Sequence, residues 1–146
     1  MKLPAWRQDR AIYPKMFQIQ TRYRDQDVLG HVNNISQSAY FDEAREKLMR
    51  SLRVGLGDDD ITRIVTAQTT VAFLAEVFHP DMVDIAAGIS RVGHSSWEIA
   101  QAMFQNGRCV ALAATTLVQA TAEGAQPLSP AFRAALEALT IDEPAG

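Results

Sequence analysis

The chain of 146 residues has a single cysteine, Cys109, and therefore no partner thiol for an internal disulfide bond and no set of thiols for a cysteine-based zinc site. It also has no apolar run long enough to cross a bilayer, and the segment from Met1 to Arg7 lacks the apolar stretch of a secretory leader. These absences predict a cytoplasmic protein that does not insert into membranes.

Basic residues are not in excess. The sequence has 14 lysines and arginines against 17 aspartates and glutamates, which gives a formal net charge of -3. A nucleic-acid-binding protein usually presents a basic face, so this balance argues against such a partner. With 47% hydrophobic and 21% charged residues, the chain has the composition of an ordinary globular protein. Its length predicts a single domain over residues 1–146.

Motifs of several enzyme classes are also missing. No GxSxG nucleophile elbow is present, and the glycines match neither the Walker nor the dinucleotide-binding pattern. The three histidines, His31, His79 and His94, are too far apart in sequence to form a local metal motif. The acidic run from Asp58 to Asp60 consists of adjacent, diverging side chains, whereas a hard-cation site needs staggered ligands. We therefore expect no metal site.

The stretch from Asp25 to Asn34 concentrates side chains with catalytic chemistry. It contains two carboxylates, an imidazole, a glycine and two adjacent amides, and it follows an alternating apolar and polar segment, Phe17 to Tyr23. That alternation predicts a strand, and the residues from Ile35 to Arg53 have the apolar spacing of a helix. The stretch is therefore predicted to be a strand-to-helix loop, with Asn33 or Asn34 as the N-cap of the helix.

The start of a helix is suited to stabilising negative charge. It presents free backbone N–H groups and about half a positive charge, so it can bind a carbonyl oxygen that becomes negative during a reaction. A carboxylate held within a few residues can act on the same carbonyl as a nucleophile or a base. Gly30 has no Cβ and lets a ligand approach the backbone closely. Asp25 is expected to have a structural role, such as pairing with Arg22 or Arg24.

The rest of the chain has the pattern of strands separated by turns, and its strongest hairpin signal is the dipeptide Asn106-Gly107. The predicted strands cover Met16 to Tyr23, Ile61 to Val77, Met82 to Val92, Ser95 to Gln105 and Arg108 to Thr121. Residues 1–14 are predicted to be an irregular lead-in, and residues 129–140 a short C-terminal helix with Ser129 as its N-cap. One long helix followed by an antiparallel meander is an α+β pattern, in which the sheet curls around the helix.

Three segments together resemble a known family. The segments are Arg22-Tyr23-Arg24-Asp25-Gln26-Asp27, Gly30-His31-Val32-Asn33-Asn34 and Tyr40-Phe41-Asp42-Glu43-Ala44-Arg45. Together they are similar to the signature of hot-dog-fold acyl-CoA thioesterases of the 4-hydroxybenzoyl-CoA thioesterase type. The resemblance extends from about Lys15 to Thr121. It implies a hot-dog fold, in which an antiparallel sheet wraps around one long helix. It also implies hydrolysis of a fatty or aromatic acyl-CoA thioester to the free acid and coenzyme A.

The resemblance assigns roles within the loop. Asp27, the second acidic residue of the pair, is the one placed against the thioester carbonyl, as a nucleophile or a general base. The backbone N–H near Asn34 is the expected oxyanion donor. His31 is a candidate catalytic or substrate contact, because an imidazole can act as an acid or as a hydrogen-bonding group near neutral pH.

Further residues are expected to hold the substrate. The candidates for substrate binding are Gly30, Asn33, Tyr40, Glu43, Arg91, Ser95 and Ser96. Glu43 is also the reserve catalytic carboxylate, and the last three candidates belong to a turn that resembles the coenzyme A contact of the family. Phe73 and Trp97 are expected to line the pocket together with Tyr40.

The resemblance also implies what the protein binds and how it assembles. Because a thioester is already activated and water is the second substrate, no cofactor beyond the coenzyme A of the substrate is expected. A homodimer or homotetramer is implied, in which protomers join their sheets and the acyl pocket lies at the interface. Two alternatives stay open: a hot-dog dehydratase or hydratase in which His31 is central, and a non-catalytic acyl-CoA binding module.

Overall fold

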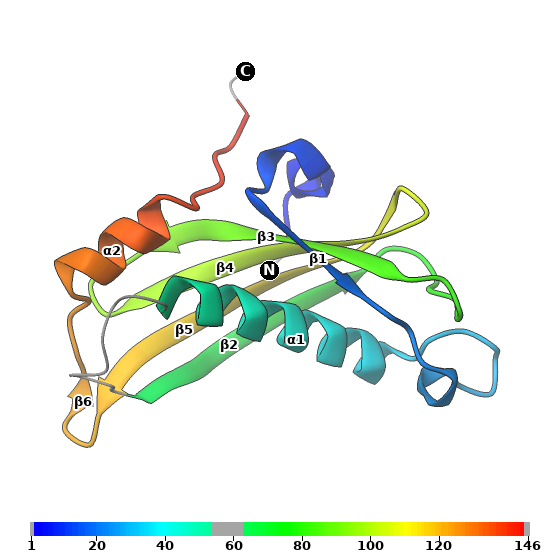
Figure 1. Ribbon diagram of the computed structural model, residues 1–146, viewed down its shortest axis with the longest axis horizontal. Coiled ribbons are helices and arrows are strands. Elements are labelled where there is room, and N and C mark those ends of the chain that lie inside the picture. Colours follow the sequence, from blue (N-terminus) through cyan, green and yellow to red (C-terminus); the bar gives the residue numbers. More distant parts are fainter. Residues whose placement is uncertain (1, 54–62, 145–146) are drawn as a thin grey trace.

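The computed structural model describes residues 2–53 and 63–144, in which an antiparallel sheet curls around one long helix, α1 (Asn34–Arg53) (Figure 1). The strands lie in the order β1-β3-β4-β5-β2, and β6 pairs with β5. Their bounds are β1 (Lys15–Ile19), β2 (Arg63–Phe73), β3 (Val83–Val92), β4 (Ser96–Gln105), β5 (Arg108–Thr121) and β6 (Gly124–Ala125). The predicted α+β arrangement of a sheet around a helix is therefore confirmed.

The inner face of α1 is apolar because its large side chains recur at helical spacing. Phe41, Ala44 and Leu48 are fully buried against the sheet. Phe41 and Ala44 belong to a core cluster that includes Met103, whereas Leu48 belongs to a second cluster that includes Ile99. Packing along both halves of the helix fixes its direction across the sheet, and so fixes where its N-terminus lies.

A second helix, α2 (Pro130–Glu137), completes the core at the end of the sheet where α1 ends (Figure 1). Ser129 is its N-cap, as predicted, because Ser129 Oγ accepts a hydrogen bond from the Phe132 N–H at 3.1 Å. The rings of Phe132 and Trp97 meet edge to face, with 5.1 Å between their centroids. Trp97, which was expected to line the pocket, is fully buried in this core.

The first strand is shorter than the sequence predicts. β1 ends at Ile19 and not at Tyr23, because the next two side chains, Gln20 and Thr21, bind the segment before β3. Thr21 donates its hydroxyl hydrogen to the Asp81 carbonyl at 2.9 Å. The chain then forms a 3-10 turn over Tyr23–Asp25. The turn leads away from the sheet and into the loop before α1.

Two other predictions concern strand ends. The hairpin predicted at Asn106-Gly107 joins β4 and β5, and both residues have positive φ values, 53° and 81°, as a tight hairpin turn requires. The strand predicted from Ile61 to Val77 corresponds to β2 and ends at Phe73. Ile61 and the acidic run from Asp58 to Asp60 lie outside the described residues.

The N-terminal segment covers part of the outer face of the sheet. It contains two 3-10 turns, Ala5–Gln8 and Arg10–Ile12, where the sequence predicted an irregular lead-in. Leu3 is buried there with Ala102 and Leu112. None of the helices in the described part of the chain has the length and apolar character needed to cross a membrane.

The two ends of the sheet carry different segments. At one end lie the loop before α1, the segment between β2 and β3, and the β4–β5 hairpin (Figure 1). At the other end lie the β3–β4 turn, α2 and the C-terminal end of α1 (Figure 1). β3 has 10 residues and separates these ends by about 30 Å.

Candidate active site

Asp25 anchors the loop that precedes α1. Its carboxylate is buried and accepts hydrogen bonds from Arg22 Nε and Nη2, both at 3.0 Å. The Tyr40 hydroxyl donates to the same carboxylate, and the Asn33 N–H donates to the Asp25 carbonyl at 3.0 Å. Hydrogen bonding to Arg22 holds the pKa of Asp25 below its ordinary range, and burial raises the pKa of Tyr40. Asp25 is thus an ionised anchor, and its partner is Arg22 and not Arg24.

Asp27 lies on the accessible side of the same loop. Its side chain is 30% exposed, and Oδ1 accepts a hydrogen bond from the Leu29 N–H at 2.9 Å. The Asp27 N–H donates to the His31 carbonyl at 2.9 Å, and the Gly30 N–H donates to the Asp27 carbonyl at 3.1 Å. Gly30 has a φ of +86°, a backbone conformation that favours glycine. This closed loop holds the Asp27 carboxylate where a ligand can reach it.

His31 lies between two carboxylates. Its Nδ1 is 3.5 Å from Asp27 Oδ2, and its Nε2 is 3.7 Å from Glu76 Oε1. The imidazole and Phe78 rings meet edge to face with 6.4 Å between their centroids. Glu76 and Phe78 belong to the segment between β2 and β3, which therefore completes the cluster. Each ring nitrogen of His31 therefore faces a carboxylate oxygen, and these two contacts fix the orientation of the ring.

The start of α1 offers unpaired donors beside this cluster. Asn33 is the N-cap, because its Oδ1 accepts a hydrogen bond from the Ser36 N–H at 2.8 Å. Among the described residues, the N–H groups of Asn34 and Ile35 have no hydrogen-bond partner. Both residues are exposed, so the two donors are open to a ligand. The helix start therefore has the donors that an oxyanion site requires.

Two polar residues of this region were not identified from the sequence. Glu76 lies far along the chain from the loop and belongs to no motif. Gln37 is buried on the inner face of α1, where its Nε2 donates to the Val32 carbonyl at 3.3 Å. Its Oε1 is buried without a partner among the described residues. The sequence could have indicated Gln37, because it is a polar residue at a helix position where the apolar spacing predicts a hydrophobic one.

The predicted substrate contacts on α1 have partners within the protein. Tyr40 is buried and its hydroxyl is bound to Asp25. Glu43 lies on the exposed face of the helix, and its Oε2 is 3.5 Å from Lys47 Nζ. Phe73 is 42% exposed at the end of β2, which is the end of the sheet that carries the loop. Of the three residues expected to line the acyl pocket, Tyr40, Phe73 and Trp97, Phe73 is therefore the accessible one.

The turn expected to contact coenzyme A lies at the other end of the sheet. Arg91 is in β3, Ser95 is in the β3–β4 turn and Ser96 begins β4. Asp27 belongs to the loop at the opposite end, about 30 Å away along the strands. A single protomer therefore does not bring these three residues to Asp27.

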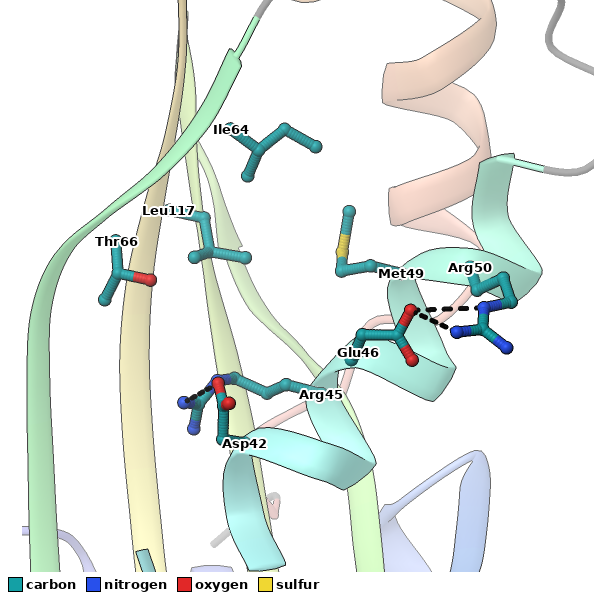
Figure 2. A pocket seen from close by; sticks show the side chains of 8 residues that line it. All are labelled: Asp42, Arg45, Glu46, Met49, Arg50, Ile64, Thr66 and Leu117. Carbon is teal, nitrogen blue, oxygen red and sulfur yellow. Dashed lines mark hydrogen bonds and ion pairs between the residues drawn. The ribbon is translucent and has the colours of Figure 1, made fainter. Parts of the chain in front are cut away.

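A cavity of about 430 Å³ lies between the second half of α1 and strands β2 and β5 (Figure 2). Met49, Ile64 and Leu117 form its apolar wall, and Arg45 brings a guanidinium group to it. The sequence predicted the motif that contains Arg45 but gave no reason to place its side chain in a cavity.

Cys109 is half-buried, and burial raises the pKa of its thiol. Within residues 2–53 and 63–144, no group of three or more His, Cys, Asp or Glu side chains is arranged to hold a metal ion.

Known proteins resemble the chain over most of its length. A family model described as the thioesterase-like superfamily matches residues 21–136. The uncharacterised protein YsmA of Bacillus subtilis (strain 168) is 28% identical over 104 residues, which cover 66% of this chain and 68% of that protein.

Solved structures resemble it as well. A thioesterase from Thermus thermophilus, complexed with coenzyme A and Zn, is 27% identical with a TM-score of 0.74, over 86% of this chain and 94% of that one. A predicted thioesterase from Bacillus stearothermophilus is 21% identical with a TM-score of 0.79, over 88% of this chain and 98% of that one. The family match begins in the loop around Asp25 and continues into α2.

Proposed function

The chain belongs to the thioesterase-like superfamily and has the hot-dog fold of its thioesterases, and from this premise we propose that it hydrolyses an acyl-CoA thioester to a free acid and coenzyme A. Thioester hydrolysis is the activity that the description of the family names. One observation carries the assignment of the site: the accessible Asp27 carboxylate lies in the loop that leads directly into α1, where the N–H groups of Asn34 and Ile35 are unpaired among the described residues.

The proposed reaction places the thioester carbonyl between Asp27 and the helix start. As a general base, Asp27 takes a proton from water, and the resulting hydroxide adds to the carbonyl carbon. The Asn34 N–H donates a hydrogen bond to the oxyanion that forms. The C–S bond then breaks, and the proton passes from Asp27 to the departing sulfur. As a nucleophile, Asp27 instead forms a mixed anhydride while the C–S bond breaks and the thiolate leaves. Water then hydrolyses the anhydride to the free acid, which restores the Asp27 carboxylate and supplies the proton that the thiolate takes up.

Neighbouring residues support these steps. His31 is proposed to contact the substrate, since the carboxylates of Asp27 and Glu76 orient its two ring nitrogens. Gly30 keeps the approach open, because no described residue beyond its two chain neighbours has an atom within 4 Å of the position that a Cβ would occupy there. Asn33 contributes by capping the helix, which leaves the next N–H groups free for the substrate.

Coenzyme A is the proposed thiol. The thioesterase from Thermus thermophilus that is 27% identical to this chain is complexed with coenzyme A. A thioester carbonyl is already activated and water is the second reactant, so the proposed reaction requires no other cofactor.

We also propose a homodimer in which the β2 edges of two protomers pair antiparallel. In the described sheet β2 pairs only with β5, and Val65 and Phe73 on it are 49% and 42% exposed. A long exposed edge with apolar side chains is a surface that a second copy can cover. Two-fold pairing brings the far end of the partner to the end that carries Asp27. Arg91 of the partner subunit, and the turn that follows it, then approach this site.

Thiol release from a panel of acyl-CoA thioesters, short to long and aromatic, tests the function. We expect Asp27→Asn to lower kcat/KM by at least about 10²-fold, the scale of losing a catalytic acid–base group. Asp142→Asn, at an exposed position outside the site, is the matched control and should keep native turnover. Tight binding without thiol release would identify a binding module. A changed acyl chain with an intact thioester would identify a hydratase or dehydratase instead.

A further inference from the structure

The cavity between α1 and the sheet has no part in the reaction steps derived above. Its volume of about 430 Å³ lies in the range of small-molecule sites in proteins. Its walls come from the second half of α1 on one side and from β2 and β5 on the other (Figure 2). A cavity of this size beside the helix that carries the oxyanion donors can hold part of a substrate.

Arg45 brings a buried cation to this cavity. Its side chain is 11% exposed, and burial lowers the pKa of its guanidinium. Nη1 donates to Oε1 of the buried Gln101 at 3.2 Å, and Nη2 donates to Asp42 Oδ1 at 3.1 Å. No other described residue accepts a hydrogen bond from Arg45. A guanidinium carries five N–H donors, so donors remain for a ligand.

The wall that faces Arg45 is apolar except for Thr66. Figure 2 shows Arg45 extending from α1 toward the strands, with Met49, Ile64 and Leu117 around the remaining space. A pocket that combines apolar side chains with a polar group whose donors are partly free binds ligands of the same character. The complementary ligand is an apolar chain with one hydrogen-bond-accepting oxygen.

The charges around the cavity cancel in pairs. Arg45 faces Asp42, and Arg50 binds Glu46 at 2.7 Å. A ligand carboxylate brought here adds a negative charge without a free cation to balance it, which is costly in a partly buried site. A neutral hydroxyl or keto oxygen needs only a donor. Because the charged side chains around the cavity are already paired with one another, the cavity favours a ligand whose hydrogen-bond acceptor is neutral.

One row of side chains runs along α1 from its N-terminus to the cavity. Asn34, Ser38, Asp42, Arg45 and Met49 follow one another at intervals of three or four residues and so lie along one side of the helix. From Asn34 to Arg45 the row is about 16 Å long. An acyl chain whose carbonyl lies at Asn34 can therefore extend along this row and bring its far end to Arg45.

We propose that this cavity binds the far end of the acyl group, and that Arg45 donates a hydrogen bond to a neutral oxygen there, so that acyl groups with a terminal hydroxyl or keto group are preferred. The inference rests on the proposed function, since it places the acyl chain between Asp27 and Arg45. It gives Arg45 a role in selecting the substrate.

Binding of non-hydrolysable probes tests this proposal without requiring turnover. The probes are S-alkyl coenzyme A thioethers of octyl, decyl and dodecyl length, each ending in a methyl, a hydroxyl or a carboxylate group. In calorimetric titrations the native protein should bind the hydroxyl-ended probe about ten-fold tighter than the methyl-ended probe at one or more lengths. Equal or weaker binding of the hydroxyl-ended probe at every length overturns the proposal, as does tightest binding of the carboxylate-ended probe.

Arg45→Met removes the donors and should reduce this preference to within about two-fold. The matched control is Lys47→Met, which removes a cation from the exposed face of the same helix and should leave the preference at its native value. If Arg45→Met does not fold, Arg45→Lys, which keeps the cation, replaces it and should show a reduced preference. A full native preference in either Arg45 variant overturns the assignment to Arg45.

Hydrolysis of the matching thioesters separates this inference from the proposed function. Thiol release without any preference in binding leaves the hydrolase standing and overturns the role of Arg45. A hydroxyl preference that depends on Arg45, without thiol release, supports the cavity and contradicts the hydrolase.

Discussion

Tyr40 donates its hydroxyl hydrogen to the carboxylate of Asp25, 15 residues earlier in the chain. The bond joins the inner face of α1 to the loop that carries Asp27, and Arg22 binds the same carboxylate through two nitrogens. The loop is thus fixed to the helix whose N-terminus it precedes. The position of Asp27 relative to Asn34 depends on this connection.

The Asp25 carboxylate makes the free energy of unfolding depend on pH in the acid range. Because hydrogen bonding to Arg22 lowers the pKa of Asp25 in the folded protein, the unfolded chain binds a proton there more readily. The stabilising contribution is therefore complete above the unfolded pKa of about 3.9 and is lost as the pH falls toward the folded pKa. We expect Asp25→Asn to lower the free energy of unfolding at neutral pH by about 2 kcal/mol and to flatten its decline below about pH 4.

Urea unfolding between neutral pH and about pH 3 measures this dependence. Asp142→Asn, which removes an exposed carboxylate, should retain the native decline. If Asp25→Asn loses stability toward low pH as steeply as the native protein, another carboxylate is responsible.

Gly30 and Gly107 form a matched pair for testing the loop. Both have positive φ values, 86° and 81°, and at either position an added Cβ would meet no atom within 4 Å in the described part of the chain, apart from the two neighbouring residues. Alanine at either position should therefore lower the free energy of unfolding by about 1 kcal/mol through backbone strain. Only Gly30→Ala should also lower kcat/KM, because only that loop carries Asp27 and His31. If the two variants have equal kcat/KM, the backbone conformation at Gly30 does not matter for catalysis.

Glu76 is expected to have a modest effect on turnover. It faces His31 Nε2 at 3.7 Å, but its side chain is 65% exposed and its charge is therefore screened by water. Glu76→Gln should lower kcat by about two- to five-fold, the range that corresponds to an exposed ion pair. Glu137→Gln removes a carboxylate of similar exposure, 58%, on α2 and is the control. A loss of 10²-fold or more for Glu76→Gln would mean that Glu76 reacts directly with the substrate.

The proposed dimer predicts a specific sensitivity in the middle of β2. Gln68 is the central residue of the strand Arg63–Phe73, so two-fold pairing along its whole length places Gln68 next to its own copy. Gln68→Glu brings like charges together across the edge and should shift the mass in solution from twice 16.1 kDa toward the monomer. Thiol release should fall in parallel, since the site then lacks the partner. Gln8→Glu, on an exposed 3-10 turn far from this edge in sequence, should remain dimeric.

Local patterns accounted for much of the fold. The spacing of Phe41, Ala44 and Leu48 predicted the helix, and the dipeptide Asn106-Gly107 predicted the hairpin between β4 and β5, because each pattern acts through neighbouring residues. The end of β1 was predicted wrongly. It depends on a hydrogen bond from Thr21 to Asp81, which is formed only when the two segments meet in the folded protein.

By itself, the sequence determined the order of the elements and the loop that carries Asp27, because turn chemistry, helix capping and hydrophobic periodicity are local properties. Only the tertiary structure decided that Glu76 faces His31 and that Arg91 lies at the far end of the sheet. It also placed the Arg45 guanidinium against a cavity. These relationships follow from which strands pair and in which direction the sheet curls, and no short stretch of residues encodes that pairing by itself.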